Sequence, residues 1–161
     1  MVFIGIDNGV SGTIGILSKN GSQFLKVPTV TQQSYTKAKQ NISRLDYWLF
    51  KSMIADHEDV RVLIERPMVN PGRFKATASA LRCLEAVLIA VEACGYRYEY
   101  IDSKEWQKVL LPKGVKAEGL KKASVDIGCR LFPQHKELIM KNKDADGLLI
   151  AEFAMRSCQR P

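Results

Sequence analysis

The sequence predicts an α/β fold with a five-stranded mixed sheet, in which three antiparallel strands come first, two parallel strands follow, and helices flank the sheet. Three observations lead to this prediction. The first 30 residues hold three short apolar runs separated by turn sequences. Later apolar runs alternate with segments of helical periodicity. The length of 161 residues suffices for one ordinary core, so we expect residues 1–161 to form a single domain.

The N-terminal segment predicts a three-stranded antiparallel meander. Val2–Ile6 and Thr13–Leu17 are rich in β-branched residues, and the turn sequence Asp7-Asn8-Gly9 lies between them. Asn20-Gly21 is a hairpin signal that leads into a third apolar run, Phe24–Val27.

The middle of the chain predicts two helices around a fourth strand. Five apolar residues recur at helical spacing and predict an amphipathic helix over residues 40–57: Ile42, Leu45, Leu49, Met53 and Ile54. The fourth strand, Arg61–Ile64, ends at Glu65-Arg66-Pro67, because proline cannot donate to a sheet ladder. The next helix, Ala76–Cys94, is apolar on most sides. We therefore expect it to be central or to form a homodimer interface, where its alanines permit close helix approach.

The C-terminal part predicts a fifth strand and three helices. Gly95 suits the end of the preceding helix, and Tyr96–Ile101 forms the strand. Ser103 is expected to cap a short helix that runs through Leu110. Two more helices are predicted at Lys116–Phe132 and Asp146–Arg156, with the polar segment Pro133–Lys143 as a linker between them.

The charge is unevenly distributed along the chain. The net charge is +7, and residues 104–143 hold ten of the Lys and Arg residues against four of the Asp and Glu residues. A concentrated basic segment favours a polyanionic partner, either nucleic acid or an anionic membrane surface. A basic balance also fits a simple solubility trait.

Cysteine usage and hydropathy predict a cytoplasmic protein without a membrane segment. The four cysteines are widely spaced and lack a nearby histidine that would complete a zinc site, so we expect buried, reduced thiols: Cys83, Cys94, Cys129 and Cys158. The apolar run Met1–Ile6 is too short for a signal peptide. No apolar stretch approaches the ~20 residues that span a bilayer.

Four acidic residues fall where sheet and helix ends can converge. Asp7 follows the first strand, Glu65 follows the fourth strand, and Asp144 and Asp146 open the last helix. Carboxylates are the ligands that Mg²⁺ and Mn²⁺ prefer. Two such ions about 4 Å apart can activate a water and stabilise the leaving oxygen of a phosphodiester. The four acids therefore predict a metal-dependent phosphodiesterase site.

Each acid also has a structural interpretation. Asp7 fits a plain turn residue, because Asp-Asn-Gly is a common turn sequence. Glu65 fits a salt bridge with Arg66. Asp144 fits a helix N-cap, and Asp146 fits a favourable charge at the helix dipole. The functional interpretation depends on finding all four together.

Five segments resemble the successive motifs of RuvC-type Holliday junction resolvases of the ribonuclease H-like superfamily, in particular the compact phage-type members: FIGIDNGVSGTIGIL, VLIERP, YIDSKEWQKVLLP, KKASVDIGCRLFP and KDADGLLIAEFA. The resemblance spans nearly the whole chain. It implies a homodimer that binds four-way or otherwise branched DNA, and that nicks opposed strands by metal-assisted hydrolysis, leaving 5′-phosphate and 3′-hydroxyl ends. It places Asp7, Glu65 and Asp146 on the acidic positions of the family.

The sequence departs from the family at one position. The family usually has an Asp or His ligand three residues before the last acid, and here that residue is Lys143. Asp144, two residues before the last acid, is expected to replace it as a ligand. In the alternative, Lys143 contacts phosphate and the site has three carboxylates.

Basic residues and one aromatic residue predict the DNA-binding surface. Six lysines are expected to contact the backbone beside the acids: Lys104, Lys108, Lys113, Lys116, Lys121 and Lys122. A solvated helix face is the alternative for some of them. Arg73, Phe74 and Lys75 place an aromatic ring between two cations, which suits stacking on an unpaired base, although a lone phenylalanine also fits the core. Trp48 and Trp106 are expected in the core.

Other functions fit parts of the pattern. A sugar-kinase or actin-like ATPase has a similar phosphate-binding turn but needs two such domains, so we expect no nucleotide cofactor. A ribonuclease for RNA–DNA hybrids, or a nuclease for flap DNA, would share the acids. A non-catalytic DNA-binding protein would have no reason to keep carboxylates beside a basic face, because unpaired acids repel phosphate.

Overall fold

A computed structural model describes residues 1–37 and 39–158. The main sheet consists of β1 (Val2–Ile6), β2 (Thr13–Ser18), β3 (Gly21–Lys26), β6 (Val60–Glu65) and β7 (Tyr98–Ile101). Its strand order is β3-β2-β1-β6-β7. The first three strands are antiparallel, β6 is parallel to β1, and β7 is parallel to β6. This confirms the predicted five-stranded mixed sheet and the α/β fold.

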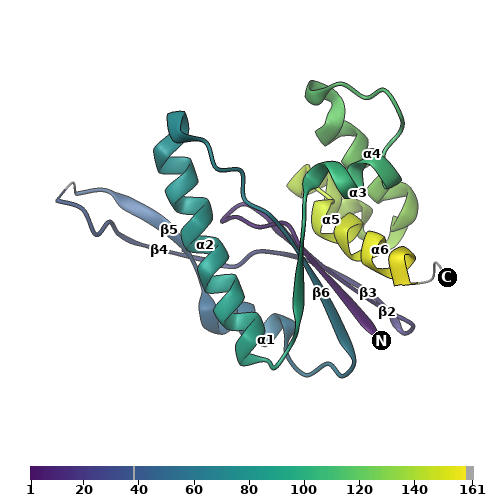
Figure 1. The fold of residues 1–161 in the computed structure, drawn as a ribbon, viewed down its shortest axis with the longest axis horizontal. Coiled ribbons are helices and arrows are strands. Elements are labelled where there is room, and N and C mark those ends of the chain that lie inside the picture. Colours follow the sequence, from purple (N-terminus) through teal and green to yellow (C-terminus); the bar gives the residue numbers. More distant parts are fainter. Residues whose placement is uncertain (38, 159–161) are drawn as a thin grey trace.

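Helices cover both faces of the sheet (Figure 1). One face carries α1 (Tyr47–Ile54) and α2 (Phe74–Ala93); the other carries α3 (Ser103–Leu110), α4 (Leu120–Leu131), α5 (Lys136–Asn142) and α6 (Asp146–Cys158). Short 3-10 turns are at Pro71–Arg73, Ala117–Gly119 and Pro133–His135. Each face has its own buried cluster, because successive side chains of a strand point to opposite faces. The β-branched residues of the central strands, such as Ile4 and Ile14, pack with α1 and α2, whereas Phe3, Leu17 and Leu63 pack with the helices of the other face.

Glycines allow α6 to lie directly on the first two strands. A Cβ added at Gly15 would come within 2.5 Å of the Gly147 carbonyl oxygen, and one added at Gly5 would come within 2.3 Å of the Ala151 nitrogen. Real Cβ atoms do not approach backbone this closely, so only glycine fits at either position. This contact fixes the start of α6 beside the end of β1.

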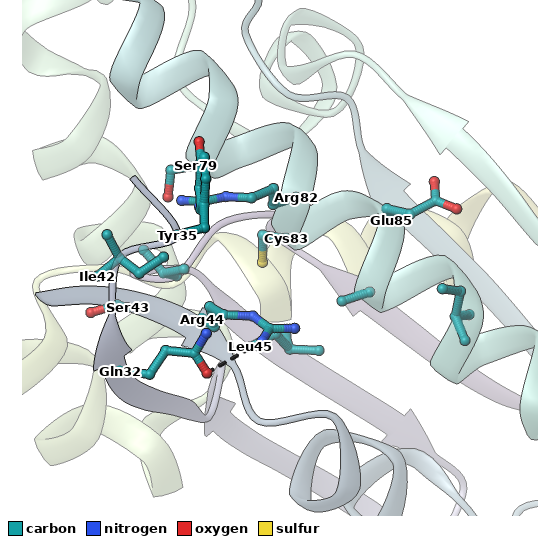
Figure 2. A pocket seen from close by; sticks show the side chains of 13 residues that line it. Gln32, Tyr35, Ile42, Ser43, Arg44, Leu45, Ser79, Arg82, Cys83 and Glu85 are labelled. Carbon is teal, nitrogen blue, oxygen red and sulfur yellow. Dashed lines mark hydrogen bonds between the residues drawn. The ribbon is translucent and has the colours of Figure 1, made fainter. Parts of the chain in front are cut away.

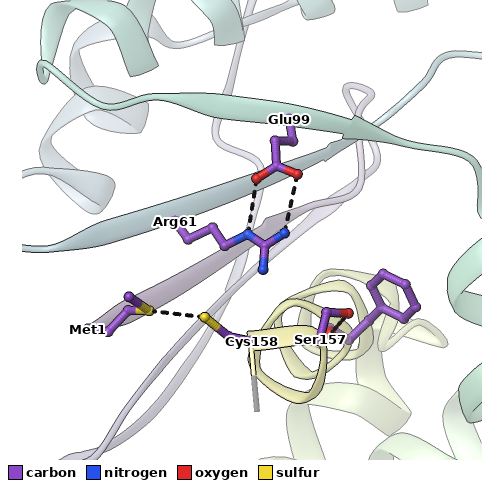
Figure 3. Close-up of polar contacts among 6 residues, drawn as sticks. Met1, Arg61, Glu99, Ser157 and Cys158 are labelled. Atoms are coloured by element: carbon purple, nitrogen blue, oxygen red, sulfur yellow. Dashed lines mark hydrogen bonds and ion pairs between the residues drawn. The ribbon is translucent and has the colours of Figure 1, made fainter. Parts of the chain in front are cut away.

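The opposite end of the sheet is held by polar contacts (Figure 3). Arg61 of β6 donates to both carboxylate oxygens of Glu99 on β7, at 3.1 and 3.2 Å. Cys158, the last residue of α6, lies 3.6 Å from the Met1 sulfur. Helix α6 therefore runs the full length of β1 in the reverse direction, so its first residues lie at the carboxyl end of that strand.

The predicted helix over residues 40–57 is wrong in its first half. Asn41–Leu45 forms β5, which pairs with β4 (Thr29–Gln33) in a separate two-stranded sheet. Asp46 then accepts a hydrogen bond from the Leu49 N–H at 3.1 Å and starts α1. The hairpin was missed because every residue of β4 is exposed, so the strand shows no alternating apolar pattern.

Three helix assignments also need correction. The segment 133–143, predicted as a linker, contains α5, whose seven residues are too few to show a period. Helix α2 begins at Phe74 rather than at residue 76. Helix α3 is capped by Asp102, not by Ser103, in a capping box with Glu105.

Two predictions of burial fail. Trp106 is fully buried, as expected, but Trp48 is 76% exposed on α1. All four cysteines are free, as predicted, yet Cys158 is exposed and only Cys83 is fully buried. Burial raises the pKa of the Cys83 thiol to about 11, so it stays protonated at neutral pH. Within the described residues, no helix combines the length and the apolar character that a membrane span requires.

Candidate functional site

The four predicted acids converge at the carboxyl end of the central strands. Asp7 follows β1 directly and Glu65 is the last residue of β6; these strands are parallel, with Ile6 paired to Ile64. Asp144 and Asp146 reach the same edge from the start of α6. One carboxylate oxygen from each of Asp7, Asp144 and Asp146 lies within 4.8 Å of the others.

Hydrogen bonds orient the two acids of the helix start. Thr13 on β2 donates to Asp144 Oδ1 at 2.9 Å, and the Asp146 N–H donates to the same oxygen at 2.8 Å. The Gly147 N–H donates to the Thr13 hydroxyl at 3.0 Å. Ser124 on α4 donates to Asp146. Asp144 thus accepts the first N–H of α6 while its carboxylate stays near Asp7, so a structural role and a site role of this residue are compatible.

Glu65 lies beside Asp7, outside the closest trio. Its charge lies close enough to raise the pKa of Asp7, and Trp106 Nε1 donates to Glu65 Oε1 at 3.2 Å. The salt bridge with Arg66 that the sequence allowed is absent, because Arg66 pairs instead with Asp102 at 3.1 Å. Glu65 is therefore left without a cationic side chain to compensate its charge among its described partners.

Sequence reasoning missed Thr13, Ser124 and the positioning role of Trp106. All three are buried. Each is an ordinary strand or helix residue in its own segment, and each meets an acid 22 to 131 positions away in sequence. No local pattern reports such contacts, so only the tertiary structure reveals them.

Burial and mutual repulsion make the acids hard to ionise. Burial is the main cause that raises the pKa of Asp7 well above its ordinary value, and the charges of Asp144, Glu65 and Asp146 add to it. Burial also raises the pKa of Glu65, partly opposed by the Trp106 hydrogen bond. The pKa of Asp146 rises to about 7, again mainly through burial and then through Asp144. Such a cluster is stabilised by a cation.

Lysines surround the acids. Lys26, Lys121 and Lys143 line the same cavity of about 560 Å³ as Asp7, Asp144 and Asp146. Lys121 lies near enough to oppose the rise of the Asp146 pKa. Lys143 adopts a left-handed conformation at the end of α5, with φ 53°. Lys26 was not among the predicted residues, because a single lysine that ends a strand gives no signal.

The other predicted DNA contacts form separate groups. Lys104, Lys108 and Lys113 line a second hollow of about 380 Å³ next to α3. Lys116 and Lys122 line neither hollow. Arg73, Phe74 and Lys75 lie at the start of α2, where Phe74 is 75% exposed. The alternative of a core position for Phe74 is thereby excluded.

The acidic cluster fits a hard divalent cation. Its donors are carboxylate oxygens without thiolate or imidazole, and these acids are partly buried and repel one another. Oxygen donors of this kind suit Mg²⁺ or Mn²⁺. Asp7, Asp144 and Asp146 are placed to hold such an ion, and Glu65 is adjacent.

Comparison with known proteins identifies solved structures that share this fold. No family model matches the sequence, and no curated protein matches it. RuvC of Thermus thermophilus in complex with a Holliday junction substrate superposes with a TM-score of 0.60 at 14% identity, covering 98% of this chain and 96% of that one. The chain has a RuvC-like fold. A second Thermus thermophilus RuvC structure superposes with a TM-score of 0.57, also at 14% identity, covering 98% of this chain and 97% of the other.

Proposed function

We propose that this protein is a metal-dependent, structure-selective DNA endonuclease that cuts branched DNA, with four-way junctions as its substrate. The observation that carries the proposal is the group of partly buried carboxylates at one sheet edge, with Lys26, Lys121 and Lys143 around it. The carboxylates repel a phosphate group, whereas the lysines attract it. A metal ion bound by the carboxylates removes this conflict, because it neutralises their charge and itself attracts phosphate.

The residues divide into two roles. Asp7, Glu65, Asp144 and Asp146 would hold Mg²⁺ or Mn²⁺, with two ions per site. Bound there, the ions supply an activated water and stabilise the leaving oxygen of a phosphodiester. The surrounding lysines bind the phosphate and orient the backbone for in-line attack.

The fourth position of the site is assigned to Asp144. Its carboxylate lies within the trio that meets inside 4.8 Å, and Thr13 fixes its orientation. Lys143, one residue earlier, lines the cavity and is assigned to phosphate. The two residues therefore act together rather than as alternatives.

Three features support branched DNA as substrate. The structural neighbour in complex with a Holliday junction shares the fold over nearly its whole length. The exposed lysines next to α3 and around the acids provide backbone contacts that do not depend on sequence. Phe74, exposed between Arg73 and Lys75, can stack on a base that pairing leaves free at a branch point. A substrate of this kind implies a cytoplasmic or phage-DNA setting.

Cutting opposed strands of a junction requires two active sites, so we propose a homodimer through α2. One side of this helix packs on the sheet through Cys83, Val87, Ala90 and Val91. The same helix leaves Leu81 43% exposed, and Leu84 and Leu88, which pack against this cluster, are only partly buried. An apolar strip at this helical spacing fits a second copy of the same helix.

One assay separates this function from its alternatives. Purified protein with Mg²⁺ is incubated with labelled four-way, three-way, flap and linear duplex DNA, and with an RNA–DNA hybrid. We expect paired nicks in opposed strands of the four-way junction. Preferred cutting of the hybrid or the flap would assign a different substrate to the same site. Binding without cutting in either Mg²⁺ or Mn²⁺ would support the non-catalytic alternative.

A further inference from the structure

A groove that the acidic site does not use lies between α2 and the β4–β5 hairpin (Figure 2). It consists of two adjoining hollows of about 400 and 410 Å³. Both hollows share Val10, Tyr35, Ile42 and Arg82 among their lining residues. The volumes fall in the range of small-molecule sites, roughly 300–1,000 Å³.

The chemistry of the groove favours an aromatic, anionic ligand. Tyr35 is 75% exposed, and the Arg82 guanidinium carbon lies 5.4 Å from its ring centre. Arg82 Nε is buried and has no hydrogen-bond acceptor among the described residues. The hollow of about 410 Å³ is also lined by Lys75 and by Phe74, a second exposed ring. A flat ring of the ligand can therefore stack on Tyr35, and an acceptor or negative charge of the ligand can bind Arg82.

The positive charge of the hairpin also favours an anionic ligand. Residues 29–45 include Lys37, Lys39 and Arg44 but no Asp or Glu. The strands themselves are polar and exposed, and in Figure 1 the hairpin extends away from the main sheet beside α2. Among the described residues, Glu85 is the one acidic residue that lines the groove, and Figure 2 shows it well apart from Tyr35 and Arg82.

The groove adjoins the acidic site. Val10, three residues after Asp7, lines both hollows. The Asn8 side-chain amide donates to the Ala80 carbonyl of α2 at 3.2 Å, which ties the turn after β1 to the wall of the groove. The segment that follows Asp7 therefore forms part of the wall of the groove.

We propose that this groove binds an unpaired nucleobase of the DNA strand, with Tyr35 as the stacking ring and Arg82 as the cation that holds it. The proposal rests on the proposed nuclease function and adds a base-binding slot formed by the hairpin. Tyr35 lines both hollows and Phe74 lines only the hollow of about 410 Å³, so the two rings are separate stacking surfaces. The strand would pass from the acids along α2, with the hairpin as its second wall.

The test compares three variants with wild type: Tyr35→Ala, Tyr35→Phe, and Trp48→Ala as a matched control. Trp48 is 76% exposed on α1 and does not line the groove. Binding to a four-way junction and to linear duplex is measured in Ca²⁺, with 2-aminopurine beside the branch point as a fluorescent base. Thermal melts check that each variant is folded, and cleavage of the junction by wild type in Mg²⁺ is measured in parallel.

We expect Tyr35→Ala to weaken junction binding roughly 5- to 150-fold, the usual effect of losing one base stack, and to abolish 2-aminopurine quenching. Tyr35→Phe and Trp48→Ala should behave as wild type. Wild-type quenching and affinity in Tyr35→Ala, while wild type still cuts junctions, would overturn the groove proposal alone. Equal losses in Tyr35→Ala and Trp48→Ala would also overturn it. Failure of wild type to bind or cut any branched DNA would overturn the proposed function as well.

Discussion

Individual carboxylates set the pH dependence of the metal-free protein. The pKa of Asp146 is about 7 in the fold against an ordinary value of 3.8, and burial also raises the pKa of Asp7 and Glu65. A raised folded pKa means that the folded state holds extra protons. The stabilisation is fully present below about pH 4 and is lost as pH rises through about 7.

Thermal melts in EDTA test this linkage. Metal-free wild type is expected to unfold at a lower temperature at pH 8 than at pH 5, and Mg²⁺ should restore more stability at pH 8, because it neutralises the ionised cluster. Asp146→Asn removes one of the titrating groups and should flatten the difference. The same pH dependence in wild type and Asp146→Asn would show that the cluster does not control it.

Phe74 is expected to affect DNA preference rather than stability. Its side chain is 75% exposed, so Phe74→Ala should change the free energy of unfolding by less than about 0.5 kcal/mol. Loss of a base stack should narrow the difference in binding free energy between junction and linear duplex by roughly 1–3 kcal/mol. Titrations of both DNAs at one salt concentration measure this difference. An unchanged difference would remove Phe74 from the junction contact.

At the residue scale, the sequence predicted the positions of the acids that lie at strand ends. Asp7 and Glu65 follow apolar runs, so their convergence follows from parallel strand pairing. The exposure of Trp48 and the contact of Trp106 with Glu65 were not predictable, because two tryptophans in similar helical patterns occupy opposite environments. Helical periodicity identifies the apolar side of a helix, but it does not show whether another element packs against that side.

The contact between α6 and the first two strands determines where two of the acids lie. Gly15→Ala would place a Cβ within 2.5 Å of the Gly147 carbonyl, one residue after Asp146. We expect a loss of roughly 1–3 kcal/mol in unfolding free energy and weaker Mg²⁺ binding, because α6 must move away from Asp7. Denaturant melts and metal titration by calorimetry measure the two effects.

Gly119→Ala is the control for this prediction. Its nearest contact is the Val115 side chain at 3.2 Å, which can adjust, and Gly119 lies before α4 rather than on the main sheet. The control should bind Mg²⁺ as wild type does. If Gly15→Ala binds Mg²⁺ with wild-type affinity although it is destabilised, the helix contact does not position the metal ligands.

At the element scale the main sheet was predictable and the β4–β5 hairpin was not. The central strands β1, β2 and β6 have β-branched apolar cores that fix their register. The hairpin is built from Thr, Gln and Ser with few buried residues, so composition favoured neither strand nor helix. Ile42 and Leu45 lie three residues apart, a spacing typical of a helix, which led the sequence interpretation to extend α1 backward.

For the molecule as a whole, the exposed strip on α2 predicts a dimer. Sedimentation at micromolar concentration and low salt should give twice the mass of one chain. Leu81→Asp places a charge on the strip and should yield monomers, whereas Val109→Asp on α3, where the wild-type residue is 39% exposed, should not. Monomeric wild type under these conditions would contradict the dimer and leave paired nicking unexplained.

The central claim is that the converging acids form a metal site that cuts branched DNA. The most direct measurement is cleavage of a labelled four-way junction in Mg²⁺, with binding measured in Ca²⁺, for wild type and for Asp7→Asn, Glu65→Gln and Asp146→Asn. Each change removes a carboxylate but no phosphate contact. We expect cleavage to be abolished in all three variants and junction affinity to stay within a few-fold of wild type. Cleavage at a near wild-type rate in any variant would contradict the assignment of that residue as a metal ligand.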